Sequence, residues 1–196
     1  MASRRAGDVV CVSRTNNGLD VTDPTSVEDI LGKLGGPFDT IVIATGVLGT
    51  PEKSVAQIDA AEMARLMAVN AIGPSLVLRH VPRLLAKTGR VAVLSARVGS
   101  IGDNQIGGWH SYRASKAALN QIVRGAAIEL KRSHRAATCV ALHPGTVETP
   151  FTAEYLGRHS MVAADEAALN LWRVIDGLGP EQSGGFFDYS GKVVPW

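Results

Sequence analysis

The chain has 196 residues, of which 45% are hydrophobic and 19% are charged, so we expect one globular domain over residues 1–196 and not a disordered or fibrous chain. Its 20 basic and 18 acidic residues are scattered and give a formal charge of +2, which offers no case for a nucleic-acid partner. No apolar run reaches the length of a membrane span, so no membrane association is expected.

Two cysteines, Cys11 and Cys139, lie in apolar runs, where a cysteine usually acts as a small buried hydrophobe. We therefore expect a reduced protein in the cytoplasm. Arg4 and Arg5 are not followed by the apolar stretch of a signal peptide, and no metal site is predicted.

The first part of the chain reads as strand, helix, strand. A run of valines and a cysteine predicts a buried strand at 9–12. Asp23 and Pro24 then predict the start of a helix, because an N-cap acceptor precedes a proline at the first helical position. Gly35 marks the end of that helix, and the run 40–44 predicts the next strand.

The remainder continues this alternation. A long helix is predicted over about 60–85, interrupted at Asn70 and by the following Gly73-Pro74 pair. Strands are predicted at 90–95 and 138–143, helices at 112–131 and 165–178, and a short last strand at 185–189. Within these strands apolar and polar residues do not alternate, which is typical of a parallel sheet covered on both faces. Because strands and helices alternate along the chain, we predict a doubly wound, Rossmann-like α/β fold with a parallel sheet. In such folds the ligand lies beyond the carboxyl ends of the strands.

Tyr112 and Lys116 carry the strongest chemical signal. Their spacing puts the phenol and the ammonium on one face of the predicted helix. A tyrosine has a pKa of about 10, and a neighbouring cation can lower this by roughly 1–3 units. The pair can therefore act as a tuned general acid or base, although a surface tyrosine one turn from a surface lysine is also common.

Further motifs occur in a fixed order around this pair: Leu19-Asp20-Val21-Thr22-Asp23, Ala44-Thr45-Gly46, Val69-Asn70-Ala71-Ile72-Gly73, Tyr112-Arg-Ala-Ser-Lys116 and His143-Pro-Gly-Thr-Val-Glu-Thr149. In this order they resemble the motifs of the short-chain dehydrogenase/reductase family, above all its small branch of C-factor and sniffer-like carbonyl reductases. The resemblance covers nearly the whole chain.

The resemblance implies hydride transfer between a nicotinamide dinucleotide and a carbonyl or alcohol carbon. Tyr112 would donate or accept the proton, Lys116 would lower the pKa of the phenol and bind the nicotinamide ribose, and Asn70 would support a proton-relaying water. The implied cofactor-binding residues are Arg14, Asp20, Val21, Ala44, Gly46, Tyr112, Lys116, Pro144, Gly145, Val147 and Thr149.

Several of these residues also have simpler interpretations. Asp20 could start a turn, Asn70 could interrupt a helix through backbone hydrogen bonds, and Thr149 could cap the next helix. Arg14 could be a solvated strand end, but an arginine after the strand at 9–12 is placed to accept a 2′-phosphate. The sequence therefore favours NADP over NAD, which stays open as a cofactor.

The catalytic serine of the family is displaced in this chain. If Gly99 is aligned with the family's glycine, Ala96 stands at the serine position. Ser95 is our candidate and Ser100 the fallback. Because successive strand side chains point to opposite faces, Ser95 could serve only at a twisted or bulged strand end.

The family's first strand and its Gly-x-x-x-Gly-x-Gly turn, which binds the pyrophosphate at a helix N-terminus, are not found before the strand predicted at 9–12. We therefore expect a fold truncated at the N-terminus. One explanation is that the reading frame has been started too far downstream, and we favour it because the downstream motifs retain residues that only catalysis would need. The other is that the truncation is real and cofactor binding is weak.

The main hypothesis is thus an NADP-preferring oxidoreductase acting on a small carbonyl or alcohol. A non-catalytic scaffold or signalling protein is the alternative, and a sugar-nucleotide epimerase is disfavoured because the chain lacks that group's additional C-terminal region. Apolar residues after Pro150, among them Phe151, Tyr155 and Met161, predict an apolar side to the substrate pocket. Family members commonly pair through their two long helices, so a homodimer or homotetramer is expected.

Overall fold

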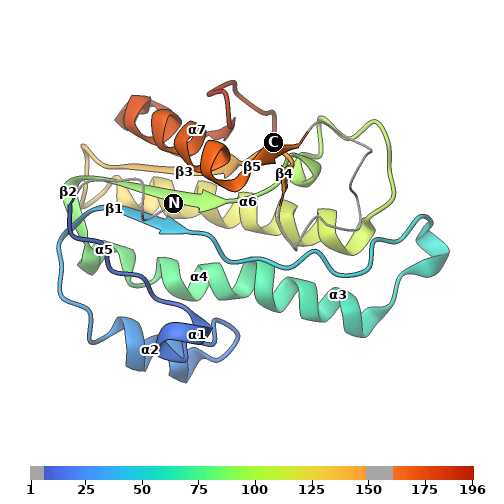
Figure 1. Cartoon of the computed structure of the whole chain (residues 1–196), viewed down its shortest axis with the longest axis horizontal. Helices are drawn as coiled ribbons and strands as arrows, with labels where there is room; N and C mark the ends of the chain where they lie inside the picture. Colours follow the sequence, from blue (N-terminus) through green and yellow to red (C-terminus); the bar gives the residue numbers. More distant parts are fainter. Residues whose placement is uncertain (1–6, 149–160) are drawn as a thin grey trace.

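The computed structural model describes residues 7–148 and 161–196. Within them, a four-stranded parallel sheet lies between layers of helices (Figure 1). The strand order is β1-β2-β3-β6, from strands Phe38–Ile43, Leu85–Leu94, Thr138–His143 and Phe186–Asp188. The predicted α/β class and parallel sheet are confirmed.

The strands form where the sequence has its valine and isoleucine runs, because β-branched side chains pack well on a buried pleated surface. One row crosses the sheet from Val42 to Ala92 to Val140. Three strands predicted from such runs, and the short last strand, are thereby confirmed. A second, two-stranded sheet pairs β4 (Val147–Glu148) with β5 (Val162–Ala163).

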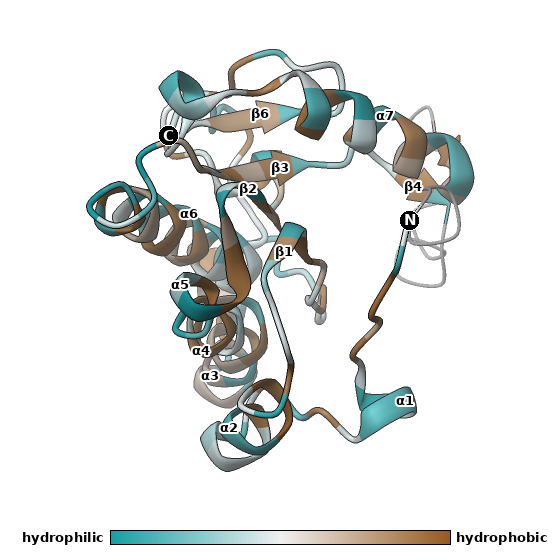
Figure 2. Ribbon diagram, turned by 90° about the vertical axis from the view of Figure 1, so that its left-hand side faces the viewer, coloured by the Kyte–Doolittle hydropathy of each residue, from teal (hydrophilic) through white to brown (hydrophobic). Residues whose placement is uncertain are grey.

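The strand predicted at 9–12 is wrong. These residues form no regular element and belong to neither sheet, and Val9 and Val10 are 49% and 55% exposed. Cys11, expected to be buried, is also exposed. A strand needs a hydrogen-bonding partner, and in Figure 2 this segment runs apart from β1. Val10 and Val12 line a cleft together with β1 residues such as Ile41.

The helices form at the predicted places. Asp23 caps α2 (Pro24–Leu31) by accepting a hydrogen bond from Thr25, and Pro24 occupies the first turn. The helices that cover the sheet include α6 (His110–Leu130) on one face and α7 (Ala164–Gly177) on the other (Figure 2). The short α1 (Arg14–Asn17) follows the exposed N-terminal segment.

The long helix predicted over 60–85 is interrupted as expected. It runs as α3 (Ala60–Met67), a π-helical turn (Ala68–Ile72), α4 (Gly73–Leu78) and α5 (Val81–Leu84). Asn70 lies in the π-helical turn, a distortion that is frequent at functional sites.

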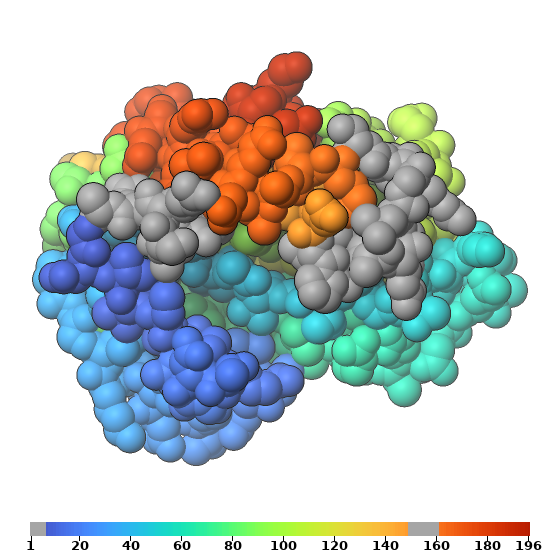
Figure 3. Space-filling model, in the orientation of Figure 1, coloured from blue at the N-terminus to red at the C-terminus, as the bar shows by residue number. Residues whose placement is uncertain are grey.

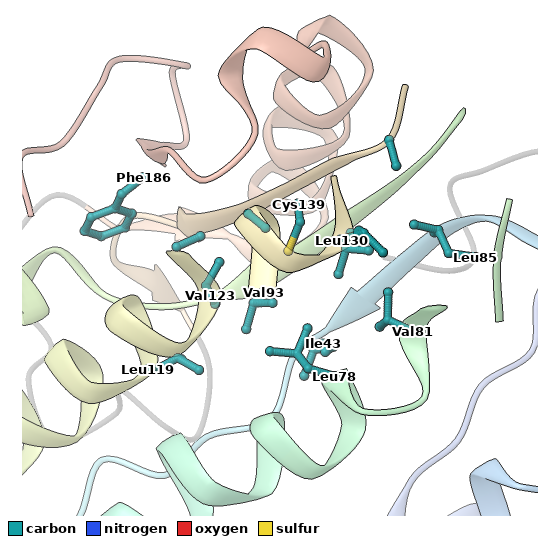
Figure 4. Close-up of a cluster of buried hydrophobic side chains, with 14 of the residues drawn as sticks. Ile43, Leu78, Val81, Leu85, Val93, Leu119, Val123, Leu130, Cys139 and Phe186 are labelled. Carbon is teal, nitrogen blue, oxygen red and sulfur yellow. The ribbon is translucent and has the colours of Figure 1, made fainter. Parts of the chain in front are cut away.

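The main core lies between the sheet and the α4, α5 and α6 layer (Figure 4). Ile43, Val93 and Leu119 come from three different elements and are at most 4% exposed. A smaller cluster, including Leu142 and Ile175, joins the opposite face of the sheet to α7. This packing fixes α6, which carries Tyr112 and Lys116, against the strands. In the described ranges 7–148 and 161–196 no helix is long and apolar enough to cross a membrane.

Candidate active site

Tyr112 and Lys116 lie in the first two turns of α6 and are both buried. The Lys116 ammonium is 5.9 Å from the centre of the Tyr112 ring and donates a hydrogen bond to the carbonyl oxygen of Leu94, at 3.1 Å. The Trp109 and Tyr112 rings form a T-shaped pair, with the ring centres 6.1 Å apart and an angle of 61° between the ring planes. The predicted helical spacing thus brings the phenol and the ammonium to one side of the helix.

Burial dominates the protonation of this pair. It raises the pKa of Tyr112 well above the ordinary value and lowers the pKa of Lys116 to about 8. The net lowering of the phenol pKa that the sequence predicts is therefore not found in this structure, because desolvation of the phenolate is the cause of the shift. At neutral pH the phenol is a proton donor beside a largely charged lysine.

Asn70 is completely buried and connects three segments of the chain. Its side chain accepts a hydrogen bond from the Val47 amide at 2.8 Å and donates to the Val47 carbonyl at 2.9 Å and to the Ser115 hydroxyl at 3.0 Å. Ser115 donates in turn to the Tyr112 carbonyl at 2.8 Å. The loop after β1, the π-helical turn and α6 are therefore held in one hydrogen-bonded network.

Gly46 allows this network to close. A Cβ atom at this position would lie 3.3 Å from the Lys116 ammonium and 3.4 Å from the Asn70 side-chain oxygen. The 3.3 Å contact is tighter than most Cβ contacts, so a side chain here would require the Lys116 ammonium to shift by a few tenths of an ångström. Gly46, Asn70 and Lys116, predicted from separate motifs, thus meet at one place.

The candidate serines face other partners. The Ser95 hydroxyl is buried and donates to the Asn120 side-chain oxygen at 2.5 Å. The Ser100 hydroxyl accepts from the Asp103 amide at 3.0 Å. Ala96, at the position of the family's serine, has no polar side chain. Because the hydroxyls of Ser95 and Ser100 have other hydrogen-bond partners, a catalytic role of either serine stays a prediction.

A cleft of about 590 Å³ runs along the open edge of β1. Gly46 and Ala44 line it near Asn70 and Lys116, and Arg14 and Val21 line it on the N-terminal side. Figure 3 shows this face, where the N-terminal residues in blue and the α7 segment in orange border a hollow. The cleft lies at the sheet edge and reaches the carboxyl end of β1, as expected for a ligand of such a sheet.

Arg14 and Asp20 lie together at the N-terminal side of this cleft. An Arg14 guanidinium nitrogen is 3.5 Å from an Asp20 carboxylate oxygen, and both side chains are exposed. Hydrogen bonds from Thr22, followed by the Arg14 charge, hold the pKa of Asp20 below its usual range. Asp20 also fits the simpler interpretation, because it accepts the Thr22 amide in a local turn.

The Pro144-Gly145 segment follows β3 and does not line this cleft. Gly145 has a φ of +79°, a conformation that favours glycine, and a Cβ there would meet the Tyr189 ring at 2.9 Å. Val147 follows in β4. Thr149, Phe151 and Tyr155 lie outside the described residues.

Two polar residues of this region were missed by sequence reasoning. Ser115 lies inside the Tyr112–Lys116 motif, and its spacing of three from Tyr112 was the signal for its bond to the Tyr112 carbonyl. Glu52 is buried against the start of α6, where Ser111 donates to its carboxylate. No local spacing links these two residues, which are 59 positions apart.

The fold and the site together define an α/β oxidoreductase with a tyrosine–lysine centre next to a cleft. Residues 10–177 match the family described as enoyl-(acyl carrier protein) reductase. The chain is 36% identical to the 1-hydroxy-2-glutathionyl-2-methyl-3-butene dehydrogenase of Rhodococcus sp. (strain AD45), over 91% of this chain and 79% of that protein.

Two further similarities cover most of the chain. It is 39% identical to the C-signal protein of Myxococcus xanthus, over 82% of this chain and 94% of that one. The NADPH-bound carbonyl reductase from chicken fatty liver superposes with a TM-score of 0.77 at 26% identity, over 91% of this chain and 75% of that chain. The chain belongs to the short-chain dehydrogenase/reductase family, in the branch that the sequence motifs indicated.

Proposed function

We propose that the protein transfers a hydride between NADP(H) and a small carbonyl or alcohol substrate, with Tyr112 as the proton donor and acceptor. Lys116 and Asn70 meet beside Gly46 at the end of the cleft, and this arrangement carries the proposal. Tyr112 has its ring 5.9 Å from the Lys116 ammonium and is joined to Asn70 through Ser115. Residues from three separate motifs contribute to it.

Residues on two sides of the cleft suit a dinucleotide, while most of its lining is apolar. Gly46 leaves room beside Lys116 that a Cβ atom would fill, and the cleft extends from there to Arg14. Arg14, Asp20 and Val21 would hold the adenosine half, with Arg14 available to a 2′-phosphate. Ala44 and Gly46, which line the cleft, and Lys116 beside Gly46 would hold the nicotinamide half. The family likeness adds Pro144, Gly145, Val147 and Thr149 to this half. When bound, the cofactor supplies or takes up the hydride.

The carbonyl oxygen of the substrate gains negative charge during reduction and needs a proton. Tyr112, which burial keeps protonated, donates it. Lys116, in its charged form, stabilises the phenolate left behind, and its pKa of about 8 allows it to pass a proton on near neutral pH. Asn70 and Ser115 hold the backbone around Tyr112 in place. Ser95 would assist only if its hydroxyl left Asn120.

NADP preference is supported by Arg14 and by the likeness to an NADPH-bound carbonyl reductase. NAD is the alternative cofactor. We further propose a cytoplasmic enzyme, for which two free cysteines in the described chain are typical, and a homodimer or homotetramer. Ile128, an apolar side chain on α6, is 53% exposed. The α6 helix is one of the two long helices through which we propose that copies of the chain pair.

A non-catalytic scaffold or signalling role is the second candidate. It is favoured by Ala96 at the position of the family's serine and by the similarity to a protein named C-signal. Calorimetric titration with NADPH separates the two candidates, because a scaffold with weakened cofactor binding gives no tight, saturable heat. Light scattering of the same sample reports the oligomeric state.

The direct test is NADPH consumption with a panel of small aldehydes and ketones, followed at the absorbance of the reduced nicotinamide. We expect turnover that depends on both substrates and is faster with NADPH than with NADH. Saturable NADPH binding without turnover of any carbonyl would contradict the proposed function.

A further inference from the structure

Glu52 is a buried carboxylate next to the candidate active site that the proposed reaction does not use. It lies in the segment after β1 and is only 7% exposed. Its carboxylate accepts a hydrogen bond from the Ser111 hydroxyl, and its two oxygens lie 3.3 and 3.4 Å from the Ser111 amide. Although burial opposes ionisation, these bonds hold the pKa of Glu52 below its usual range.

The first turn of α6 depends on this carboxylate for its capping. Amide groups in the first turn of a helix have no partner within the helix and are commonly capped by a serine, threonine, aspartate or asparagine side chain. Trp109 stands at the N-cap of α6 and makes no side-chain capping bond. The Glu52 carboxylate instead accepts a hydrogen bond from the Ser111 amide in the first turn. Its negative charge also suits the positive end of the helix dipole.

The backbone of Glu52 holds the residues just before the helix. Its carbonyl oxygen accepts a hydrogen bond from the Trp109 amide at 2.6 Å. Trp109 has a φ of +55°, which is uncommon for a residue other than glycine and persists only where its surroundings hold it. A Cβ at Gly108 would lie 3.2 Å from the same oxygen, so this close approach suits a glycine.

We propose that Glu52 is a positioning residue for Tyr112: it fixes residues 109–111 and thereby sets where the phenol at the next position points. Tyr112 follows Ser111 directly, and its ring contacts the Trp109 ring. The proposal rests on the proposed function, because it concerns the proton donor of that reaction. Reactions that need aligned groups lose about 100-fold in rate when a group is displaced by about 1 Å.

The test compares Glu52→Ala and Glu52→Gln with the control Glu62→Ala. The Glu62 carboxylate accepts a hydrogen bond from the amide of Thr50, which lies in the same loop as Glu52, at 3.3 Å. Its other partner is Arg65, so neither of these bonds involves α6. Steady-state kinetics with NADPH and a carbonyl are measured for each variant. Amide hydrogen exchange over residues 107–116 is measured without NADPH, so that this readout does not depend on turnover.

We expect Glu52→Ala to lower kcat by about 30-fold while the KM for NADPH stays within about twofold. Glu52→Gln keeps an acceptor for the Ser111 hydroxyl but loses the negative charge, so its rate should be intermediate between those of the wild type and Glu52→Ala. Exchange over 107–116 should rise about tenfold or more in Glu52→Ala and stay at the wild-type level in Glu62→Ala. If Glu52→Ala does not fold, the intermediate loss in Glu52→Gln, with faster exchange at 107–116, is the expected result.

Unchanged exchange at 107–116 in the Glu52 variants would overturn the proposal, as would faster exchange with an unchanged kcat. An equal loss of rate in Glu62→Ala would assign the effect to the loop as a whole and would also overturn it. A wild-type protein without turnover would contradict the proposed function itself, while the exchange data would still decide whether Glu52 fixes this turn.

Discussion

The polar side chains of the Tyr112 cluster, which comprises Asn70, Tyr112, Ser115 and Lys116, are held differently from those of the N-terminal segment, residues 8–22. In the cluster they are buried, and bonds such as Asn70 to Ser115 join residues 45 positions apart. In the N-terminal segment the bonds are exposed and join residues two to six positions apart, as from Arg14 to Asp20.

This difference predicts which parts of the site keep their geometry on their own. A buried hydrogen bond is costly to leave unmade, whereas an exposed ion pair contributes about 0–1 kcal/mol. The arrangement around Tyr112 should therefore be rigid, and the Arg14 side of the cleft should depend on what binds there.

Tyr112→Phe should have the largest effect on activity. Removing the proton donor should lower kcat for carbonyl reduction by about 100-fold or more, because general acid catalysis typically contributes 10²–10⁴-fold. NADPH affinity and the circular dichroism spectrum should stay close to wild type. A variant that retains more than about a tenth of the wild-type kcat would exclude Tyr112 as the proton donor.

Asn70→Ala should destabilise the fold, and Asn16→Ala should not. The first change leaves the amide and carbonyl of Val47 and the Ser115 hydroxyl without their partner, so we expect a loss of about 3 kcal/mol in the free energy of unfolding. Asn16 is exposed in the N-terminal segment, and its replacement should change stability by less than about 0.5 kcal/mol. Urea denaturation measures both, and equal effects would contradict the contrast.

A pair of valines separates the two regions by packing alone. Val93 is fully buried in β2, so Val93→Ala should cost about 2 kcal/mol of unfolding free energy through lost burial and a cavity. Val10 is 55% exposed, and Val10→Ala should cost less than about 0.5 kcal/mol. A similar cost at both positions in urea denaturation would mean that the N-terminal segment is packed in solution.

The rate of carbonyl reduction should fall as the pH rises through about 8. Burial lowers the pKa of Lys116 to about 8, so the ammonium that stabilises the developing phenolate of Tyr112 loses its charge above this value. We expect kcat to fall about tenfold per pH unit on this alkaline side and to be level below it. A level profile from about pH 7 to pH 9.5 would argue against a role for the Lys116 charge.

Arg14→Ala should have the smallest effect. An exposed arginine that meets a 2′-phosphate contributes modestly, so the KM for NADPH should rise about fivefold and the KM for NADH should not change. Steady-state kinetics with both cofactors measure this. An equal rise for NADPH and NADH would remove the basis for NADP preference at Arg14.

The sequence allowed most of the fold to be predicted because its signals are local. The valine and isoleucine runs at 40–44 and 138–143 and the Asp23-Pro24 start each describe an element by themselves. The run at 9–12 carries the same apolar signal, yet it forms no strand, because a strand also requires a neighbour that the local sequence does not specify.

The part of the site that could be predicted is the part that local motifs specify. Tyr112, Lys116 and Asn70 were identified from motifs, and the structure brings them together. The bond of Ser95 to Asn120 and that of Ser111 to Glu52 could not be foreseen, because they join residues 25 and 59 positions apart. The raised pKa of Tyr112 depends on burial, which the helical spacing of the pair does not reveal.

Transfer of deuterium is the most direct test of the proposed reaction. The protein is incubated with a carbonyl from the panel and NADPH deuterated at the transferred position, and the alcohol product is analysed by mass spectrometry. We predict a product one mass unit heavier with the wild-type protein and almost none with Tyr112→Phe over the same time. Saturable NADPH binding without deuterium in any product, or equal labelling by both proteins, would contradict the account.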